Sequence, residues 1–162
     1  MINYKRFIDS EINNISENDF KNIFKISDRQ FSKDYFLDKF NKKKSFFKPI
    51  SNYLYLAYND KELVGYLFGE KRKSNFKIKW MGVSEKYLNQ KIGLKIKIRV
   101  LSDLRVSGIK QVISQAHTEQ IKNLNDKIIK RKGKTHYQLT EEKSKNSAFK
   151  YRFFSKFKIK RK

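Results

Sequence analysis

The chain has 162 residues, with 39 Lys and Arg against 16 Asp and Glu, which gives a formal charge of +23 at neutral pH. This length fits one domain with a sizeable core, and the absence of cysteine excludes disulfides and thiolate metal sites. Two histidines are too few for a His-rich metal centre, so we expect no metal.

The sequence is typical of a soluble, cytoplasmic protein. No apolar run approaches the roughly 18 residues of a membrane span, and the first residues lack the apolar centre of a signal peptide. We expect a single domain over residues 1–162, with a frayed basic tail at 155–162.

The positive charge has two competing explanations. It predicts salt-sensitive attraction to an anionic partner, such as nucleic acid, the ribosome or a phosphorylated substrate. However, Lys far exceeds Arg, and Asn, Ile, Phe and Tyr are plentiful, as an AT-rich genome would produce. Arg is preferred where phosphates or bases are bound bidentately. Genome bias is therefore the favoured explanation.

The N-terminal part predicts a strand and two helices. Residues 2–8 are expected to form the strand. Ser16 is a capping residue before a helical stripe of apolar residues over 16–26. A second helix is expected after Ser32, with aromatic residues at helical spacing through Phe40.

The middle of the chain predicts a sheet. Residues 52–70 favour a hairpin because two β-rich runs flank a turn signal at 59–61. Further strands are expected at 76–83 and 110–116. Residues 118–133 favour a helix, with an apolar face and a glycine stop at the end.

One segment carries conflicting signals. Residues 92–100 alternate strictly between apolar and other residues, which favours a strand. Continued to Leu104, the same segment shows helical spacing from Leu94 and Ile96, and about 17 residues is long for a strand. We expect a helix. With closing strands near 136–139 and 149–154, the order predicts an α+β (α/β) sheet with helices on its faces.

The stretch "VSEKYLNQKIG" joins the strand ending at Val83 to this helix. The first amides of a helix lack internal partners and carry partial positive charge, so such a turn can hold a pyrophosphate. Gly93 would let the backbone approach a ligand closely, and Lys86, Lys91 and Lys95 add charge. The alternative is an ordinary connection with an incidental glycine.

With its element order, this stretch resembles the signature of the GNAT superfamily of acyl-CoA-dependent N-acetyltransferases. That signature is a strand ending Val-x-Pro, then aromatic-Arg-Gly-x-Gly-x-Gly, then a helix. Val83, Tyr87 and Gly93 retain its Val, aromatic and last Gly. Its Pro, Arg and first two glycines are replaced by Glu85, Leu88, Asn89 and Lys91.

Flanking segments extend the resemblance over most of the chain. "NDKELVGYLFGE" is similar to the second and third strands of the family. "VISQAHTEQIKNLNDK" is similar to the strand and helix that read N-x-x-A-x-x-Leu-Tyr-x-Lys, with Thr118 at the Asn and Leu124 at the Leu. Asn125 stands at the position of the family's tyrosine.

The resemblance implies a mostly antiparallel sheet whose central strands splay apart near Met81 to Val83. It implies that acetyl-CoA or another acyl-CoA lies there, with its pantetheine paired like an added strand and its pyrophosphate on the amides of 88–94. The implied cofactor-binding residues are Met81, Gly82, Val83, Leu88, Asn89, Gln90, Lys91, Ile92, Gly93, Leu94, Thr118 and Asn125.

Catalysis would need a base for the amine and an acid for the departing thiolate. An amide cannot donate a proton usefully, although Asn125 can hydrogen-bond the sulfur. Glu70 and Glu85 are candidate bases, as is His117, for which an ordinary surface histidine is the competing explanation. Tyr137 could replace the missing tyrosine.

We therefore expect an N-acetyltransferase that acts on an amino sugar, a small amine or a protein amine, with an anionic acceptor favoured by the charge. A basic nucleic-acid-binding module, and a GNAT-shaped binding partner without turnover, are the alternatives. The oligomeric state is open, a homodimer included.

Overall fold

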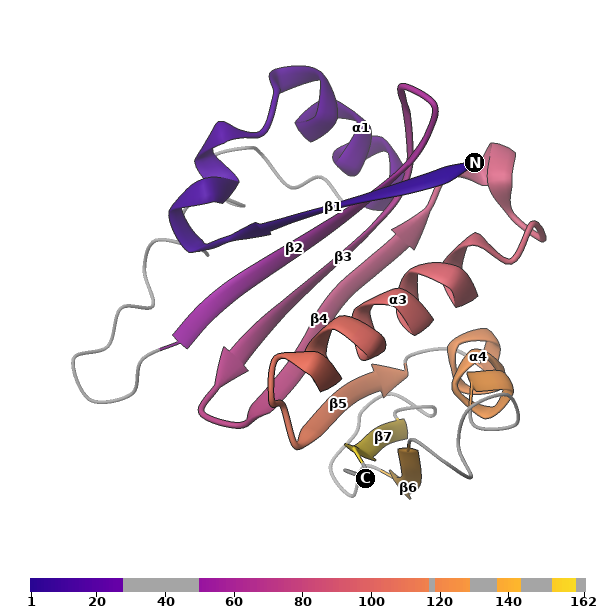
Figure 1. Cartoon of the computed structure of the whole chain (residues 1–162). Helices are drawn as coiled ribbons and strands as arrows, with labels where there is room; N and C mark the ends of the chain where they lie inside the picture. The colour runs from indigo at the N-terminus through magenta and orange to yellow at the C-terminus, as the bar shows by residue number, and fades with distance from the viewer. Residues whose placement is uncertain (28–49, 117–118, 129–136, 144–152, 160–162) are drawn as a thin grey trace.

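The fold is given by a computed structural model that describes residues 1–27, 50–116, 119–128, 137–143 and 153–159. Its strands form one seven-stranded sheet in the order β1-β2-β3-β4-β5-β7-β6 (Figure 1). Each neighbouring pair is antiparallel except β4 and β5, which run parallel. The strands are β1 Ile2–Ile8, β2 Ile50–Asn59, β3 Glu62–Arg72, β4 Asn75–Val83, β5 Gln111–Ala116, β6 Tyr137–Lys143 and β7 Phe153–Ile159. The expected mixed, mostly antiparallel sheet is confirmed.

Helices cover both faces of the sheet. Helix α1 lies on one face, and α3 and α4 lie on the other (Figure 1). The helical segments are η1 Asp9–Asn14, α1 Glu17–Ser27, η2 Glu85–Tyr87, α3 Ile92–Val106 and α4 Glu119–Ile128. None of the helices within the described ranges is long and apolar enough to cross a lipid bilayer.

The two-sided cover explains the unbroken apolar run of β2. Tyr53, Tyr55 and Ala57 pack in the core under α3, and the alternate residues Leu54 and Leu56 pack in the core under α1. A strand covered on both faces has no need of polar residues at every second position. The predicted hairpin is confirmed, with its turn between Asn59 and Glu62.

The conflicting segment is a helix, as predicted. Its buried positions recur at helical spacing and include Ile92, Ile96, Val100, Leu101 and Leu104. The strict alternation of "IGLKIKIRV" breaks down on the folded helix, because Ile98 is only partly buried. Helix α3 is tied to the sheet by its own carboxylate, since Arg6 and Tyr55 both donate to Asp103.

Other local predictions divide into three groups. The strand at 2–8, the Ser16 cap of α1 and the strands at 76–83 and 110–116 are confirmed. The helix expected after Ser32 and the stop at Gly133 lie outside the described residues. The frayed tail is wrong for 155–159, where β7 continues to Ile159 and pairs with both β5 and β6.

The tail is a strand because its charges alternate with apolar residues. Lys158 is exposed, whereas the next residue, Ile159, is buried and donates its amide to the Lys110 carbonyl at 2.8 Å. The high charge of the segment suggested a solvated end. Its two-residue period was the more informative signal.

Candidate functional site

Strands β4 and β5 are joined over only part of their lengths. Asn75 to Ile78 pair with Gln111 to Ser114, and beyond Ile78 no residue of β4 pairs with β5 in the described sheet. Strand β4 nevertheless continues along β3 to Val83, and β5 continues along β7. The two strands therefore diverge toward their C-terminal ends (Figure 1). The expected splay is present and already begins after Ile78.

A β-bulge marks the point of divergence. Phe68 of β3 pairs with Trp80, but the next residue, Gly69, pairs with Ile78. Lys79 is therefore an extra residue in β4. A bulge of this kind bends its strand and increases the local twist. Its position accounts for the turn of β4 away from β5.

The bulge also exchanges the two faces of β4. Before it, Phe76 and Ile78 pack in the core under α3. After it, Trp80 packs in the core under α1, while Met81 and Val83 pack under α3. Uninterrupted alternation would have placed Trp80 on the same face as Ile78. The edge of β4 left without β5 thus carries Met81 and Val83 on the α3 side.

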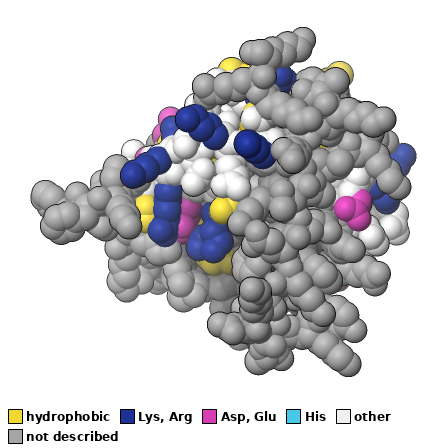
Figure 2. Space-filling model, turned by 90° about the horizontal axis from the view of Figure 1, so that it is seen from below, with side chains coloured by type: hydrophobic (Ala, Val, Ile, Leu, Met, Phe, Trp, Pro, Cys, Tyr) yellow, Lys and Arg dark blue, Asp and Glu magenta, His cyan; other side chains and the backbone are white. Residues whose placement is uncertain are grey.

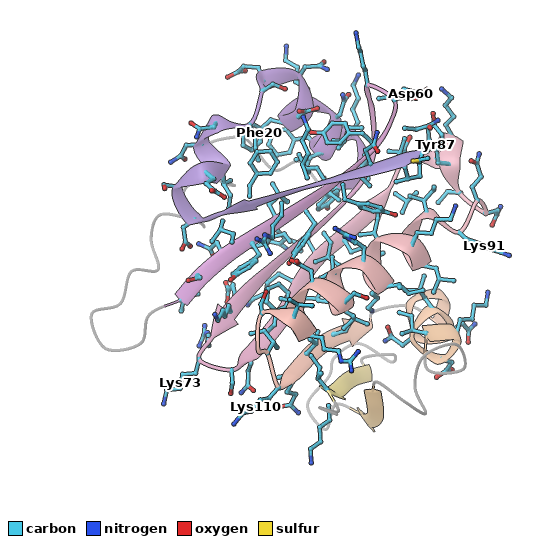
Figure 3. All side chains as sticks on the ribbon, viewed as in Figure 1. Phe20, Asp60, Lys73, Tyr87, Lys91 and Lys110 are labelled. Carbon is cyan, nitrogen blue, oxygen red and sulfur yellow. The ribbon has the colours of Figure 1, made fainter. Side chains whose placement is uncertain are left out.

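Tyr87 anchors the connection between β4 and α3. The aromatic ring is buried, and its hydroxyl donates to Glu62 Oε2 at 2.7 Å. Lys86 Nζ donates to the same carboxylate oxygen at 3.0 Å and lies over the Tyr87 ring. Two hydrogen bonds lower the pKa of Glu62, and the one from Tyr87 has a larger effect than the one from Lys86. Tyr87, which stands at the aromatic position of the signature, thus links this loop to the β2–β3 hairpin (Figure 3).

Two residues of the connection adopt left-handed backbone conformations. Asn89 has φ 67° and Lys91 has φ 61°. This region favours glycine, because other residues suffer a clash between Cβ and the following carbonyl oxygen. These are the positions of the first two of the three glycines in the signature. At both positions this chain therefore adopts a conformation that glycine adopts most readily.

Helix α3 begins at Ile92 and presents unsatisfied amides. The first helical amide with an acceptor is that of Lys95, which donates to the Lys91 carbonyl at 3.0 Å. Among the described residues, the amides of Ile92, Gly93 and Leu94 have no backbone acceptor. Exposed Lys91 lies at this end of the molecule (Figure 3). Backbone N–H groups and the helix dipole both favour an anion there.

The role expected for Gly93 is wrong in one respect. A Cβ atom at Gly93 would lie 3.2 Å from Met81 Cε, 3.5 Å from Val83 Cγ2 and 3.6 Å from Leu124 Cδ1. The bare side of the glycine therefore faces other side chains of the protein. Its small size lets α3 pack closely on β4 and α4, and it opens no path for a ligand on that side.

A buried lysine lies beside the point of divergence. Lys97 of α3 has 1% of its surface exposed and donates to Ser114 Oγ on β5 at 2.8 Å and to Asn125 Oδ1 on α4. Burial lowers the pKa of Lys97 to about 7. Sequence reasoning missed this residue, which reads as one of several surface lysines in "LKIKIR". The available signal was its spacing from Val100, Leu101 and Leu104 on the apolar face of the helix.

The predicted acid–base candidates are not gathered at one point. Glu70 follows Phe68 on the α1 face of β3, with its carboxylate 3.6 Å from both Lys79 Nζ and Arg72 Nη2. Glu85 is exposed on η2, beyond the end of β4. Of the predicted site residues, Asn125 is fully buried beside Lys97.

The remaining candidates lie elsewhere or outside the described residues. Tyr137 is on β6 and pairs with Ile159, near the start of β5 and away from Ser114. His117 and Thr118 lie outside the described residues. Leu88 and Gln90 are exposed beside Asn89 in the connection. The described residues contain no group of three His, Asp or Glu side chains placed to hold a metal ion.

Comparisons with known proteins agree with this architecture. No protein-family model and no curated protein match the sequence. Among solved structures, the ribosomal-protein-S18-alanine N-acetyltransferase of Escherichia coli matches with a TM-score of 0.63 at 8% identity, covering 97% of this chain and 92% of its own. A Desulfovibrio desulfuricans protein assigned to the GNAT family of acetyltransferases gives 0.61 at 12% identity, covering 97% of each chain.

The chain has the GNAT fold. The PaiA N-acetyltransferase of Thermoplasma acidophilum, crystallised with coenzyme A, also matches, with a TM-score of 0.59 at 12% identity over 98% of this chain and 99% of its own. At these identities the likeness concerns the fold. The resemblance inferred from "VSEKYLNQKIG" is confirmed at that level.

The residues at the divergence suit the parts of a CoA thioester. The amides of Ile92 to Leu94 are donors without described backbone acceptors, which suits a diphosphate. The edge of β4 beyond Ile78 is not paired with β5, which suits an extended amide chain. Lys97 places an amino group beside the point where the two strands part. The fold of this chain therefore has groups that fit both ends of such a thioester.

Positive charge is not confined to this end of the GNAT fold. Figure 2 shows Lys and Arg side chains gathered on the lower face of the molecule. Exposed Lys73 and Lys110 lie at the lower end of the sheet, far from Lys91 (Figure 3). The charge of the chain is thus spread over both ends of the sheet.

Proposed function

We propose that the chain is an acyl-CoA-dependent N-acetyltransferase that transfers an acetyl group to an amine. The observation that carries this proposal is the divergence of β4 from β5 after Ile78, beside the first turn of α3. In a GNAT fold, this arrangement sets an unpaired strand edge next to a helix N-terminus. One extended ligand with amides and a diphosphate could use both features.

The residues have distinct roles in this proposal. The edge from Met81 to Val83 pairs with the pantetheine amides, and an N–H near Val83 polarises the thioester carbonyl. The amides from Leu88 to Leu94 and the ammonium of Lys91 hold the phosphates. Bound acetyl-CoA supplies the activated acetyl group, and the acceptor amine is itself the nucleophile. No nucleophilic side chain is needed.

The acceptor is proposed to be a protein or small-molecule amine in the cytoplasm. The charge of +23 favours an anionic acceptor or one that lies in a ribonucleoprotein. The Escherichia coli neighbour is named for alanine of a ribosomal protein, which suits the second of these. Glu85 and His117 are the candidate bases on the chain. Glu70 is less suitable because it lies on the α1 face with Lys79.

Calorimetry with acetyl-CoA tests the proposal directly. We expect saturable one-to-one binding, and release of free CoA thiol when the right class of amine is added. A panel of amino sugars, polyamines and peptide N-termini identifies that class. Absence of acetyl-CoA binding at millimolar concentration would refute the transferase. Binding without thiol release for any amine would indicate a GNAT-shaped binding protein.

A further inference from the structure

Three elements of the fold meet at the amino group of Lys97. The lysine comes from α3, Ser114 Oγ comes from β5 at 2.8 Å, and Asn125 Oδ1 comes from α4. All three residues are buried, with 1%, 2% and 0% of their surfaces exposed. Burying a charged lysine costs free energy unless the amino group is paired or loses its proton.

The position of this cluster in the sheet is specific. Ser114 pairs with Ile78 in the last residue pair between β4 and β5. The Lys97 amino group is therefore one hydrogen bond from the point at which the strands part. Asn125 is the residue that stands in place of the family's tyrosine, and its side-chain oxygen accepts a hydrogen bond from Lys97.

Two neutral side-chain oxygens accept hydrogen bonds from the buried Lys97 amino group. Both named acceptors are neutral, and desolvation lowers the pKa of Lys97 to about 7. Helices α3 and α4 and strand β4 carry other charged residues. Those whose burial the structure describes are exposed or half-buried, namely Lys95, Arg99, Asp103, Arg105, Asp126, Lys127, Lys77 and Lys79. An anion beside this amino group would be stabilised by the charged form of Lys97. The anion would in turn raise the pKa of Lys97.

We propose that Lys97 stabilises the thiolate released from acetyl-CoA, acting with Asn125 in place of the missing tyrosine. The inference rests on the proposed function. In the transfer, the amine nitrogen bonds to the acetyl carbon, the carbon–sulfur bond breaks with its electron pair on sulfur, and the amine proton leaves to the base, for which Glu85 and His117 are the candidates. Lys97 donates to the Asn125 side-chain oxygen, and its ammonium balances the new negative charge on sulfur.

The test is a pH titration of the CoA thiol in its complex, followed by the ultraviolet absorbance of the thiolate. Free alkyl thiols have a pKa of about 8.5. A neighbouring ammonium should lower the thiol pKa of bound CoA by about one unit or more. In Lys97→Met the shift should disappear. In the control Arg99→Met, which removes an exposed positive charge from the same helix, it should persist.

Each outcome of the titration supports or overturns the role proposed for Lys97. An unshifted thiol in the wild-type complex overturns the inference without any variant, and so does an equal shift in wild type and Lys97→Met. If Lys97→Met fails to fold, Lys97→Gln replaces it in the same comparison. If calorimetry finds no CoA binding by the wild-type chain, the proposed function fails, and this inference fails with it. Binding with an unshifted thiol overturns only the role of Lys97.

Discussion

Ile78 of β4 and Ser114 of β5 form the last residue pair that joins these two strands. The next residue on β4, Lys79, is the bulge that turns the strand away. The side chain of Ser114 accepts a hydrogen bond from buried Lys97. One point in the sheet therefore combines the opening of the backbone with an ammonium group. The backbone geometry and the charge of the candidate site therefore come from residues that are neighbours in space.

The pH dependence of stability should reveal the burial of Lys97. Its pKa is lowered from 10.5 to about 7 in the folded chain, so between these values the unfolded chain binds more protons. Wild-type stability should then rise as the pH increases from about 7 toward about 10, by at most about 1.4 kcal/mol per pH unit. Lys97→Met should lack this rise. Urea unfolding of wild type and Lys97→Met between about pH 7 and about pH 10 measures this difference. The same pH dependence of stability in both proteins would contradict the lowered pKa of Lys97.

The elements of the fold were largely predictable because their signals are local. The Ser16 cap, the turn at 59–61 and the helical spacing from Ile96 to Leu104 each depend on residues close in the sequence. The strand period of the last segment was also present in the sequence. It was overlooked because the charge of that segment suggested an exposed tail.

The details of the site were less predictable because they depend on residues far apart. The bulge at Lys79 becomes visible only when β4 is aligned with β3, since the strand reads as ordinary alternation by itself. Lys97 meets Ser114 and Asn125 across 17 and 28 residues of sequence. The left-handed conformations of Asn89 and Lys91 could have been expected from their alignment on glycines of the signature.

Two glycines of the sheet and helix should differ in their tolerance of alanine. A Cβ at Gly69 would lie 2.8 Å from the Lys77 carbonyl oxygen and closer still to the Phe76 ring. A Cβ at Gly93 would meet the mobile end of Met81 at 3.2 Å. Gly69→Ala should cost about 1 to 3 kcal/mol, and Gly93→Ala less than about 1 kcal/mol. Urea denaturation compares them, and equal losses would contradict the packing described here.

Backbone strain at Lys91 should make glycine acceptable there. Because Lys91 has φ 61°, Lys91→Gly should raise the unfolding free energy by up to about 1 kcal/mol or leave it unchanged. Lys95→Gly removes the same charge from the interior of α3 and should cost about 1 kcal/mol. Thermal unfolding of the two variants measures the contrast. A comparable loss at both positions would argue against the left-handed conformation.

Charge reversal at two lysines separates local from general electrostatics in cofactor binding. Lys91 and Lys73 are both exposed and both left-handed, with φ 61° and 53°, but they lie at opposite ends of the sheet (Figure 3). Lys91→Glu places a negative charge beside the amides of Ile92 to Leu94. Acetyl-CoA affinity should fall about tenfold or more, corresponding to about 1.4 kcal/mol.

Lys73→Glu changes the net charge of the chain by the same amount. It should alter acetyl-CoA affinity by less than about twofold, because the two ends of the sheet are separated by more than the screening length of about 8 Å at physiological salt. Calorimetry at two salt concentrations measures both variants. An equal loss of affinity in the two would mean that only the overall charge attracts the phosphates. A loss confined to Lys91→Glu, and smaller at high salt, would place the anion at the first turn of α3.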